Sequence, residues 1–329
     1  MLKLTHCLIP SLRVPYQGAC YNSPVSMATL QLLASRPLSG KTTVAVALGR
    51  GFAAAGVRVR LVRTGKGVAA IEDAATFAEY PDASGRSTGQ PVPADKLPAA
   101  ARGEVVIVEQ DAGAEPLAGA PAIVVVRGAP TEADGALAAS LGDRLLGTIA
   151  TVVAPGAVDA VARALTDGGL RPLALIPEDR VLAAPGVAEI RDALGARVLF
   201  EGDNDREVVE DVLIAPVYAD PARPHFRRFE SKAVLAPFNK TDLHLAAIET
   251  QAACLVITGG RDPSPYVLDR AQHGTTTVLL AEQETPETLA SLSEVWLTSR
   301  FRGERKAAAA YAALQGRLDF AALAKKIQG

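Results

Sequence analysis

Short apolar runs alternate with longer segments of helical periodicity from Ala28 onward. The runs that we expect to be buried strands are 29–34, 57–62, 104–108, 122–126, 145–153 and 172–176. Residues 42–55 have a helical pattern, and Gly56 follows at the position where helices commonly end. Alternating strands and helices are typical of an α/β fold, so the pattern predicts a mostly parallel sheet with helices on both faces.

The same pattern begins again after the polar segment EGDNDR at residues 201–206. Further strands are expected at 212–217, 233–236, 254–257 and 276–280. Two pairs mark helix starts, Ser264-Pro265 and Thr285-Pro286, because a hydroxyl can cap a helix whose next residue is proline. We therefore expect a first unit over 27–200, a smaller α/β unit over 201–300, and a C-terminal helix over 301–329.

The first 26 residues differ from the rest of the chain in having prolines, two cysteines and no clear period. Pro10, Arg13 and Pro15 interrupt the apolar run that a signal peptide needs. We interpret residues 1–26 as a leader or disordered tail, with Met27 as a possible native start. A specific docking arm is the alternative interpretation.

Charge and composition exclude several classes of protein. The chain of 329 residues has 34 basic and 36 acidic residues, so it lacks the basic excess of a nucleic-acid-binding protein. It contains no run of about 18 apolar residues that would predict a membrane span. Three cysteines and four histidines show no metal-binding spacing. We expect a cytoplasmic protein that binds neither nucleic acid nor membrane.

The strongest motif is ASRPLSGKTT at residues 34–43, between the first expected strand and the first expected helix. The N–H groups of such a loop and of the helix N-terminus form a polyphosphate site. Lys41 would reach the outer phosphates, and the Thr42 hydroxyl would bind Mg²⁺. Ser35 stands where the motif GxxxxGK[ST] has its first glycine. The expected nucleotide-binding residues are Ser35, Ser39, Gly40, Lys41, Thr42 and Thr43; an ordinary turn is the alternative.

A phosphate loop also needs a carboxylate at the end of a neighbouring strand to hold the metal ion. Glu109 follows the apolar run EVVIV directly, and Asp111 lies two residues further on. Asp73 is a second acidic candidate. Arg63 and Lys66 follow the second expected strand and could add positive charge beside the phosphates. A solvent-facing strand end, an exposed helix residue and ordinary loop charges are the respective alternatives.

These segments together resemble a known family. From Met27 to about residue 199, the chain resembles the dethiobiotin synthetase-like P-loop family, in the form found at the N-terminus of long phosphate acetyltransferases. The shared segments include LLASRPLSGKTT, EDAATFA, VVIVEQDAG and LGDRLLGTIATVV. Residues 205–300 resemble the DRTGG domain through REVVEDVLIAPV, KTDLHLAAIET and ACLVITGGRDPSPYVLDRA. The resemblance implies a P-loop NTPase-type parallel sheet followed by a smaller DRTGG-like domain.

The resemblance also assigns roles to single residues. Lys41 matches the phosphate-binding lysine of the family, and Thr42 matches its magnesium-binding hydroxyl. Glu109 and Asp73 match carboxylates associated with the metal. The resemblance thus implies ATP or another nucleoside triphosphate with Mg²⁺, and a metal site of Thr42, Asp73 and Glu109.

Two departures from the family concern its chemistry. Arg63-Thr64 stands where dethiobiotin synthetases have a Lys-Pro pair, so Arg63 joins Lys41 as a candidate catalytic residue with altered geometry. Ala150-Thr151 stands where the family has its adenine-reading asparagine. The sequence therefore leaves open both the substrate and the choice between ATP and GTP.

The second unit carries its own ligand candidates. Lys240 and Asp242 remain from the charged segment of the DRTGG domain, in the local sequence FNKTD. Thr258, Gly259 and Gly260 end an expected strand, where their backbone could bind an anion. The same glycines could instead only turn the chain.

We derive three functional hypotheses. The first is a nucleotide-binding regulatory protein with slow NTP hydrolysis and a second ligand at the DRTGG-like unit. The alternatives are an ATP-dependent ligase that activates a carboxylate or carbamate, as dethiobiotin synthetase does, and a scaffold with a decayed nucleotide site. Phosphate acetyltransferase activity is not expected, because its domain would need about 300 further residues. Family analogy implies a homodimer.

Overall fold

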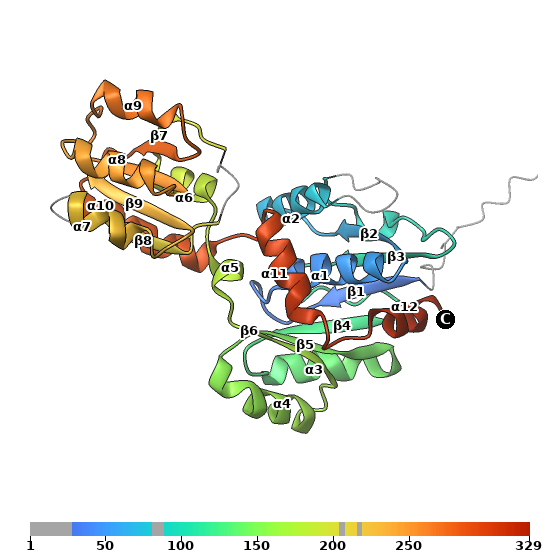
Figure 1. Ribbon diagram of the computed structural model, residues 1–329. Coiled ribbons are helices and arrows are strands. Elements are labelled where there is room, and N and C mark those ends of the chain that lie inside the picture. The colour runs from blue at the N-terminus through green and yellow to red at the C-terminus, as the bar shows by residue number, and fades with distance from the viewer. Residues whose placement is uncertain (1–27, 81–88, 204–207, 216–218) are drawn as a thin grey trace, which may run out of the picture.

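The computed structural model describes residues 28–80, 89–203, 208–215 and 219–329, with two sheets in two lobes (Figure 1). The predicted leader over 1–26 and the possible start at Met27 lie outside the described residues. Among the described residues, no helix is long and apolar enough to span a membrane.

The first sheet has six parallel strands in the order β2-β3-β1-β4-β5-β6. They are β1 (Thr29–Leu33), β2 (Arg58–Arg63), β3 (Glu104–Glu109), β4 (Ala122–Arg127), β5 (Leu145–Val153) and β6 (Pro172–Pro177). The predicted α/β fold with a parallel sheet is confirmed. The chain crosses from β1 to β2 and later returns to β4 on the other side of β1, so the strand order reverses beside β1. Ligands of open α/β sheets bind at this kind of switch point.

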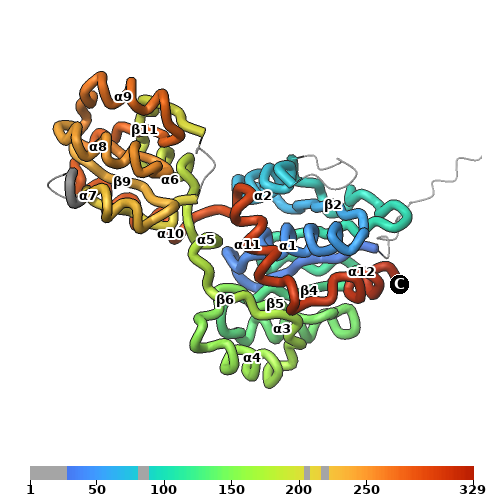
Figure 2. Tube along the Cα trace, viewed as in Figure 1, coloured from blue at the N-terminus to red at the C-terminus, as the bar shows by residue number. Residues whose placement is uncertain are grey.

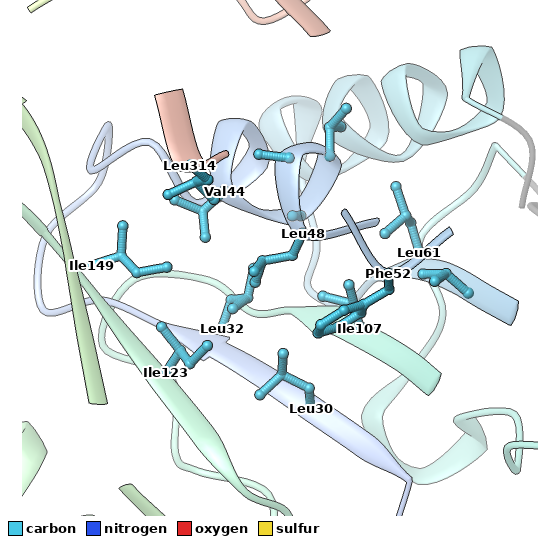
Figure 3. Close-up of a cluster of buried hydrophobic side chains, with 14 of the residues drawn as sticks. Leu30, Leu32, Val44, Leu48, Phe52, Leu61, Ile107, Ile123, Ile149 and Leu314 are labelled. Carbon is cyan, nitrogen blue, oxygen red and sulfur yellow. The ribbon is translucent and has the colours of Figure 1, made fainter. Parts of the chain in front are cut away.

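Helices cover both faces of the first sheet. They are α1 (Lys41–Ala54), α2 (Val68–Glu79), α3 (Glu132–Leu141), α4 (Val158–Asp167), α11 (Glu304–Leu314) and α12 (Phe320–Gln328), with short 3₁₀ turns at Ala94–Lys96, Gly142–Arg144 and Pro155–Ala157. The core on one face joins β1, β3, β4 and β5 to α1, α11 and α12, and Figure 3 shows Leu32, Leu48 and Ile107 within it. The core on the other face joins the sheet to α3 and α4.

The C-terminal segment differs from the single helix that the sequence predicted over 301–329. It forms two helices, because the chain turns between them at Gly316, which has φ +77°. Leu314 of α11 and Ile327 of α12 are buried in the first core. Phe320 packs so closely on α1 that a Cβ at Gly51 would lie 2.2 Å from its ring. The end of the chain is thus a structural part of the first lobe.

The second sheet has five strands in the order β7-β11-β10-β9-β8. They are β7 (Arg197–Phe200), β8 (Asp211–Ile214), β9 (Lys232–Pro237), β10 (Cys254–Thr258) and β11 (Thr277–Leu280), and β7 alone is antiparallel. The helices of this lobe are α6 (Val187–Leu194), α7 (Ala219–Phe226), α8 (Thr241–Glu249), α9 (Pro265–Ala271) and α10 (Thr285–Thr298), whereas the short α5 (Arg180–Ala183) lies in the connection and packs against the first lobe through Leu182. Because β8 to β11 are added in sequence order with one crossover hand, α7, α8 and α9 share one face, while α6 and α10 pack on the other.

The second lobe begins before residue 201, where the sequence placed its start. Strand β7 pairs with β11, and Val187 and Ile190 of α6 share a core with Leu292 of α10. The chain leaves the first lobe after β6 and returns to it at α11 (Figure 2). In sequence, the second lobe is therefore inserted between two segments of the first. The two connections touch, since Ser299 Oγ donates to the carbonyl of Ala184 over 2.9 Å.

Candidate functional site

The loop at residues 34–43 joins the carboxyl end of β1 to the first turn of α1. Gly40 precedes the helix with φ +82°, and Leu38 has φ +54°, a left-handed conformation that non-glycine residues seldom adopt. The carbonyl of Leu38 accepts a hydrogen bond of 2.9 Å from Arg127 Nη1. Ser35 does not have a positive φ, so its backbone does not require the glycine of the sequence motif.

The first turn of α1 presents backbone donors toward the loop. Within the described part of the chain, the amides of Gly40, Lys41, Thr42 and Thr43 donate to no other protein group. The first amides of a helix have no acceptor inside the helix, and the helix dipole adds partial positive charge there. A loop of this form suits a phosphate group.

Lys41 adds a full charge to these donors. Its side chain is 7% exposed, and burial lowers the pKa of its ammonium group, while the nearby Glu109 carboxylate acts in the opposite direction. Ser39 is also buried, and its Oγ has no hydrogen-bond partner among the described residues. A buried hydroxyl without a partner is costly, so Ser39 Oγ is a ready donor for a ligand oxygen.

Three oxygen-bearing side chains meet beside the loop. Thr42 Oγ1 lies 3.1 Å from Glu109 Oε1 at the end of β3 and 3.4 Å from Asp73 Oδ1 on α2. Glu109 is buried and its Oε2 has no partner in the described chain. Burial, and secondarily the charge of Asp73, raises the pKa of Glu109 to about 7.

This donor set fits Mg²⁺. Magnesium takes one or two carboxylates together with hydroxyl, water and phosphate oxygens, and Thr42, Asp73 and Glu109 offer oxygen alone. The unpartnered Oε2 of Glu109 leaves an acceptor for a cation. No cluster of three or more His, Cys, Asp or Glu side chains suited to a metal ion occurs in the described ranges, so the hydroxyl and a ligand's own oxygens would have to complete the coordination.

Arg63 ends β2 beside Glu109 in the sheet register. Its Nε lies 3.0 Å from Asp73 Oδ2, and its Nη2 lies 2.7 Å from Asp111 Oδ1. Glu109 Oε1 is 3.8 Å from Nε. The guanidinium therefore neutralises part of the acidic cluster, and its donors are already occupied by the carboxylates of Asp73 and Asp111 and by the carbonyl of Thr64.

Two residues that we did not predict hold the loop in place, Asp134 of α3 and Thr151 of β5. Ser35 Oγ donates to Asp134 Oδ1 over 2.6 Å, and Thr151 Oγ1 donates to the carbonyl of Ser39 over 2.7 Å. The Thr151 side chain also packs against Gly40, where a Cβ would lie 3.2 Å from its methyl group. These pairs are separated by about 100 residues in sequence, so no local pattern could have identified them.

The ligand candidates of the second lobe lie at the carboxyl ends of β9 and β10, and the structure corrects one expectation there. The amides of Gly259 and Gly260 already donate to the carbonyls of Gln283 and Ala281, over 2.8 and 3.0 Å. They therefore do not form the predicted backbone anion site in this conformation.

The remaining candidates of the second lobe have mixed surroundings. Thr258 Oγ1 is buried and shares a hydrogen bond of 2.7 Å with Thr285 Oγ1. Lys240 precedes α8, and Asp242 lies exposed in its first turn. Their role as ligand-binding residues stays a prediction.

Comparison with known proteins identifies the second lobe. Residues 189–295 match the DRTGG domain. This range includes α6 and β7, in agreement with the earlier start that the sheet pairing gives.

One solved structure similar to part of the chain is a crystal structure of the CBS and DRTGG domains of the regulatory region of Clostridium perfringens pyrophosphatase, complexed with its activator diadenosine tetraphosphate. The identity is 20% and the TM-score is 0.31. The match covers 35% of this chain and 49% of that chain, about half its length.

Proposed function

We propose that the first lobe binds a nucleoside triphosphate with Mg²⁺ at loop 34–43, and that the chain is a regulatory protein sensing a nucleotide or metabolite. The main support for the proposal is that three features meet at the carboxyl ends of β1 and β3. A buried lysine, unpartnered first-turn amides and an oxygen-rich cluster around Thr42 all face the same loop. A simple βα turn has no need to bury a lysine and two unsatisfied oxygens together.

Each group then has a defined task. The amides of the first turn of α1 and the Ser39 hydroxyl donate to phosphate oxygens, and the Lys41 ammonium neutralises the outer phosphates. Mg²⁺ would be held by Thr42, Asp73 and Glu109, and when bound it would neutralise charge on the phosphates. Arg63 pairs with Asp73 and thereby reduces the repulsion between the carboxylates of Asp73 and Glu109.

The engagement of Arg63 supports slow turnover. Phosphoryl transfer is accelerated by a cation that is free to stabilise charge on the transferred group. The donors of Arg63 are directed at Asp73 and Asp111, so the arginine would have to leave these partners to reach a substrate. The same observation counts against a ligase that uses Arg63 as the family uses its lysine.

The contacts of α2 support communication between the lobes. Asp73 on this helix is one of the candidate metal ligands. The adjacent Glu72 forms a salt bridge with Arg300, in the connection from α10 to α11. Tyr80, which follows the helix, donates its hydroxyl to the carbonyl of Gly303 over 2.7 Å. The match of the second lobe to the DRTGG domain supports a role beyond nucleotide turnover.

The test is a calorimetric titration of Mg·ATP, and separately Mg·GTP, into the full chain. Lys41→Met keeps the aliphatic stem and removes the charge, and we expect at least about tenfold weaker binding because a charge-assisted hydrogen bond is lost. Lys326→Met is the matched control, since Lys326 is exposed on α12, which carries none of the candidate nucleotide-binding residues. Equal binding by wild type and Lys41→Met would remove the phosphate-loop assignment, and no binding by wild type would favour the scaffold.

A second assay separates the sensor from the ligase. A sensor releases ADP slowly, at a rate that carboxylic acids and amines leave unchanged. A ligase of the dethiobiotin synthetase type releases ADP much faster with one substrate class. A flat response across a broad panel therefore supports the sensor. Homodimerisation and a cytoplasmic location remain predictions, which analytical ultracentrifugation and cell fractionation would test.

A further inference from the structure

The buried carboxylate of Asp134 connects α3 to the phosphate loop. Asp134 is 1% exposed and is the third residue of α3. Its Oδ2 accepts from the amide and the hydroxyl of Thr131, over 2.8 and 2.7 Å, and these bonds cap its own helix. Its Oδ1 accepts from Ser35 Oγ over 2.6 Å. One oxygen therefore serves α3, and the other reaches a different element.

A buried negative charge beside a phosphate site is unfavourable unless donors surround it. Asp134 has three donors within 2.8 Å and the positive end of α3, and the exposed Arg36 side chain approaches its Oδ2 to 4.0 Å. The helix cap is complete without Ser35. The hydrogen bond from Ser35 is therefore not needed for the cap, and its effect is to hold the loop against α3.

The position of Ser35 gives this bond its importance. The sequence motif has glycine there, but the backbone of Ser35 needs no positive φ. The serine adds a donor that glycine lacks. Further along the loop, Arg127 holds the carbonyl of Leu38 and Thr151 holds the carbonyl of Ser39. The loop is thus anchored at its beginning by α3, in its middle by β4 and near its end by β5.

We propose that Asp134 is a positioning residue, which through Ser35 fixes the phosphate loop in its binding conformation before any nucleotide arrives. The inference rests on the proposed nucleotide-binding function. A preformed loop binds more tightly because less conformational entropy is lost on binding. Ser35 is therefore a functional substitute for the motif glycine and not a sign of decay.

The decisive variant is Ser35→Gly, because the two views predict opposite results. If the serine is a defect, restoring the motif glycine leaves nucleotide binding unchanged or improves it. If Ser35 positions the loop, Ser35→Gly and Ser35→Ala weaken Mg·ATP binding about tenfold, the effect of losing one hydrogen bond to a charged group. Ser35→Thr keeps the hydroxyl and should restore affinity. The alanine variant separates loss of the donor from added backbone freedom.

The carboxylate itself is tested by Asp134→Asn with a matched control. Asp134→Asn leaves a single acceptor oxygen, which cannot accept from both Thr131 and Ser35, and puts a donor in place of the other oxygen. It should therefore weaken binding, and Ser35→Ala should weaken it less in this variant than in the wild type. Thr131→Val is the control, since it removes a bond to the same carboxylate without touching the loop. We expect Thr131→Val to lower the melting temperature while leaving Mg·ATP affinity unchanged. Affinity losses that simply follow the melting temperature in all variants would make Asp134 merely structural and overturn the inference.

Amide hydrogen exchange over residues 36–43 in the nucleotide-free protein is the independent readout. Exchange should be faster in Ser35→Ala and Asp134→Asn than in wild type and Thr131→Val. Equal exchange in all four proteins would overturn preorganisation even if nucleotide binds. If wild type binds no nucleotide, the proposed function fails, whereas the exchange experiment still decides whether Asp134 positions the loop.

Discussion

Lys306 is a buried charge at the junction of the two lobes. Its side chain is 1% exposed, and its Nζ donates to Ser299 Oγ over 2.9 Å and to the carbonyl of Arg300. No described carboxylate lies within ion-pair distance of this nitrogen. Burial lowers the pKa of Lys306 to about 8, with the charge of Glu189 opposing the shift. The stability of the connection should therefore depend on pH through the protonation of Lys306.

The expected pH dependence follows from the direction of that shift. Below pH 8 Lys306 is protonated in both states, so the folded protein bears the cost of a buried charge. Between pH 8 and about 10.5 the folded state releases the proton and the unfolded state keeps it, so stability rises with pH. Lys306→Met removes the cost and should be more stable than wild type at pH 7. This advantage should shrink by on the order of 3 kcal/mol toward pH 10.5.

Urea denaturation of wild type and Lys306→Met at pH 7, 8, 9 and 10 measures this difference in the free energy of unfolding. A difference that does not change with pH would mean that Lys306 keeps its proton in the folded state throughout the range.

Among the elements, α11 and α12 link the end of the chain to the core of the first lobe. Leu314 is fully buried against α1 and the sheet, and Phe320 meets Phe52 edge to face with ring centroids 6.3 Å apart. The alanine-rich face of α11 lets it lie close to α1, and Ala307 and Ala310 are both buried. The loop at residues 34–43 leads directly into α1, so α11 and α12 stabilise the element that carries the candidate site.

Leu314→Ala should therefore destabilise the protein by about 2–5 kcal/mol, the usual cost of a cavity in a packed core. Leu297→Ala is the matched control, because Leu297 on α10 is 77% exposed, and it should change stability by less than about 0.5 kcal/mol. Chemical denaturation followed by circular dichroism gives both values. Equal effects of the two substitutions would contradict the role of α11 in the core.

On the scale of the whole molecule, one salt bridge links the second connection directly to α2. Arg300 pairs with Glu72 on this helix, and its backbone amide donates to Glu189 Oε1 of the second lobe over 2.7 Å. Arg305 continues the contact to Glu210 over 2.7 Å. The chain's single tryptophan, Trp296, packs in the second lobe and reports its unfolding separately.

We expect Mg·ATP to raise the unfolding temperature seen by Trp296 fluorescence, although the proposed nucleotide site is in the other lobe. At a ligand concentration of 100 times the dissociation constant, binding stabilises the folded protein by about 2.7 kcal/mol. We expect the connection to pass part of this stabilisation to the second lobe. Arg300→Ala should reduce this shift while leaving calorimetric affinity unchanged. Arg197→Ala, which removes an exposed pair within the second lobe, is the control. A shift of the same size in Arg300→Ala would exclude this route of coupling.

Local sequence was sufficient for the framework of this protein. Alternating apolar runs predicted the six strands of the first sheet, because burial on both faces of a parallel sheet requires continuous apolar residues. Lys41, Thr42 and Glu109 were candidates because the motif GxxxxGK[ST] and a strand end have local signatures. The structure brings their side chains close together, while their role in binding a nucleotide stays a proposal. The backbone donors of α1 likewise follow from the start of a helix.

Tertiary structure alone decided what surrounds that framework. The return of α11 and α12 to the first core depends on complementary packing between segments about 250 residues apart, such as Arg50 and Glu304. The bonds of Gly259 and Gly260 to the loop after β11 depend on how neighbouring strands end. The Ser35–Asp134 bond joins residues that only the approach of α3 to the loop brings within 2.6 Å. Periodicity and local motifs determine elements, whereas the partners of a buried polar group are set by the three-dimensional arrangement of those elements.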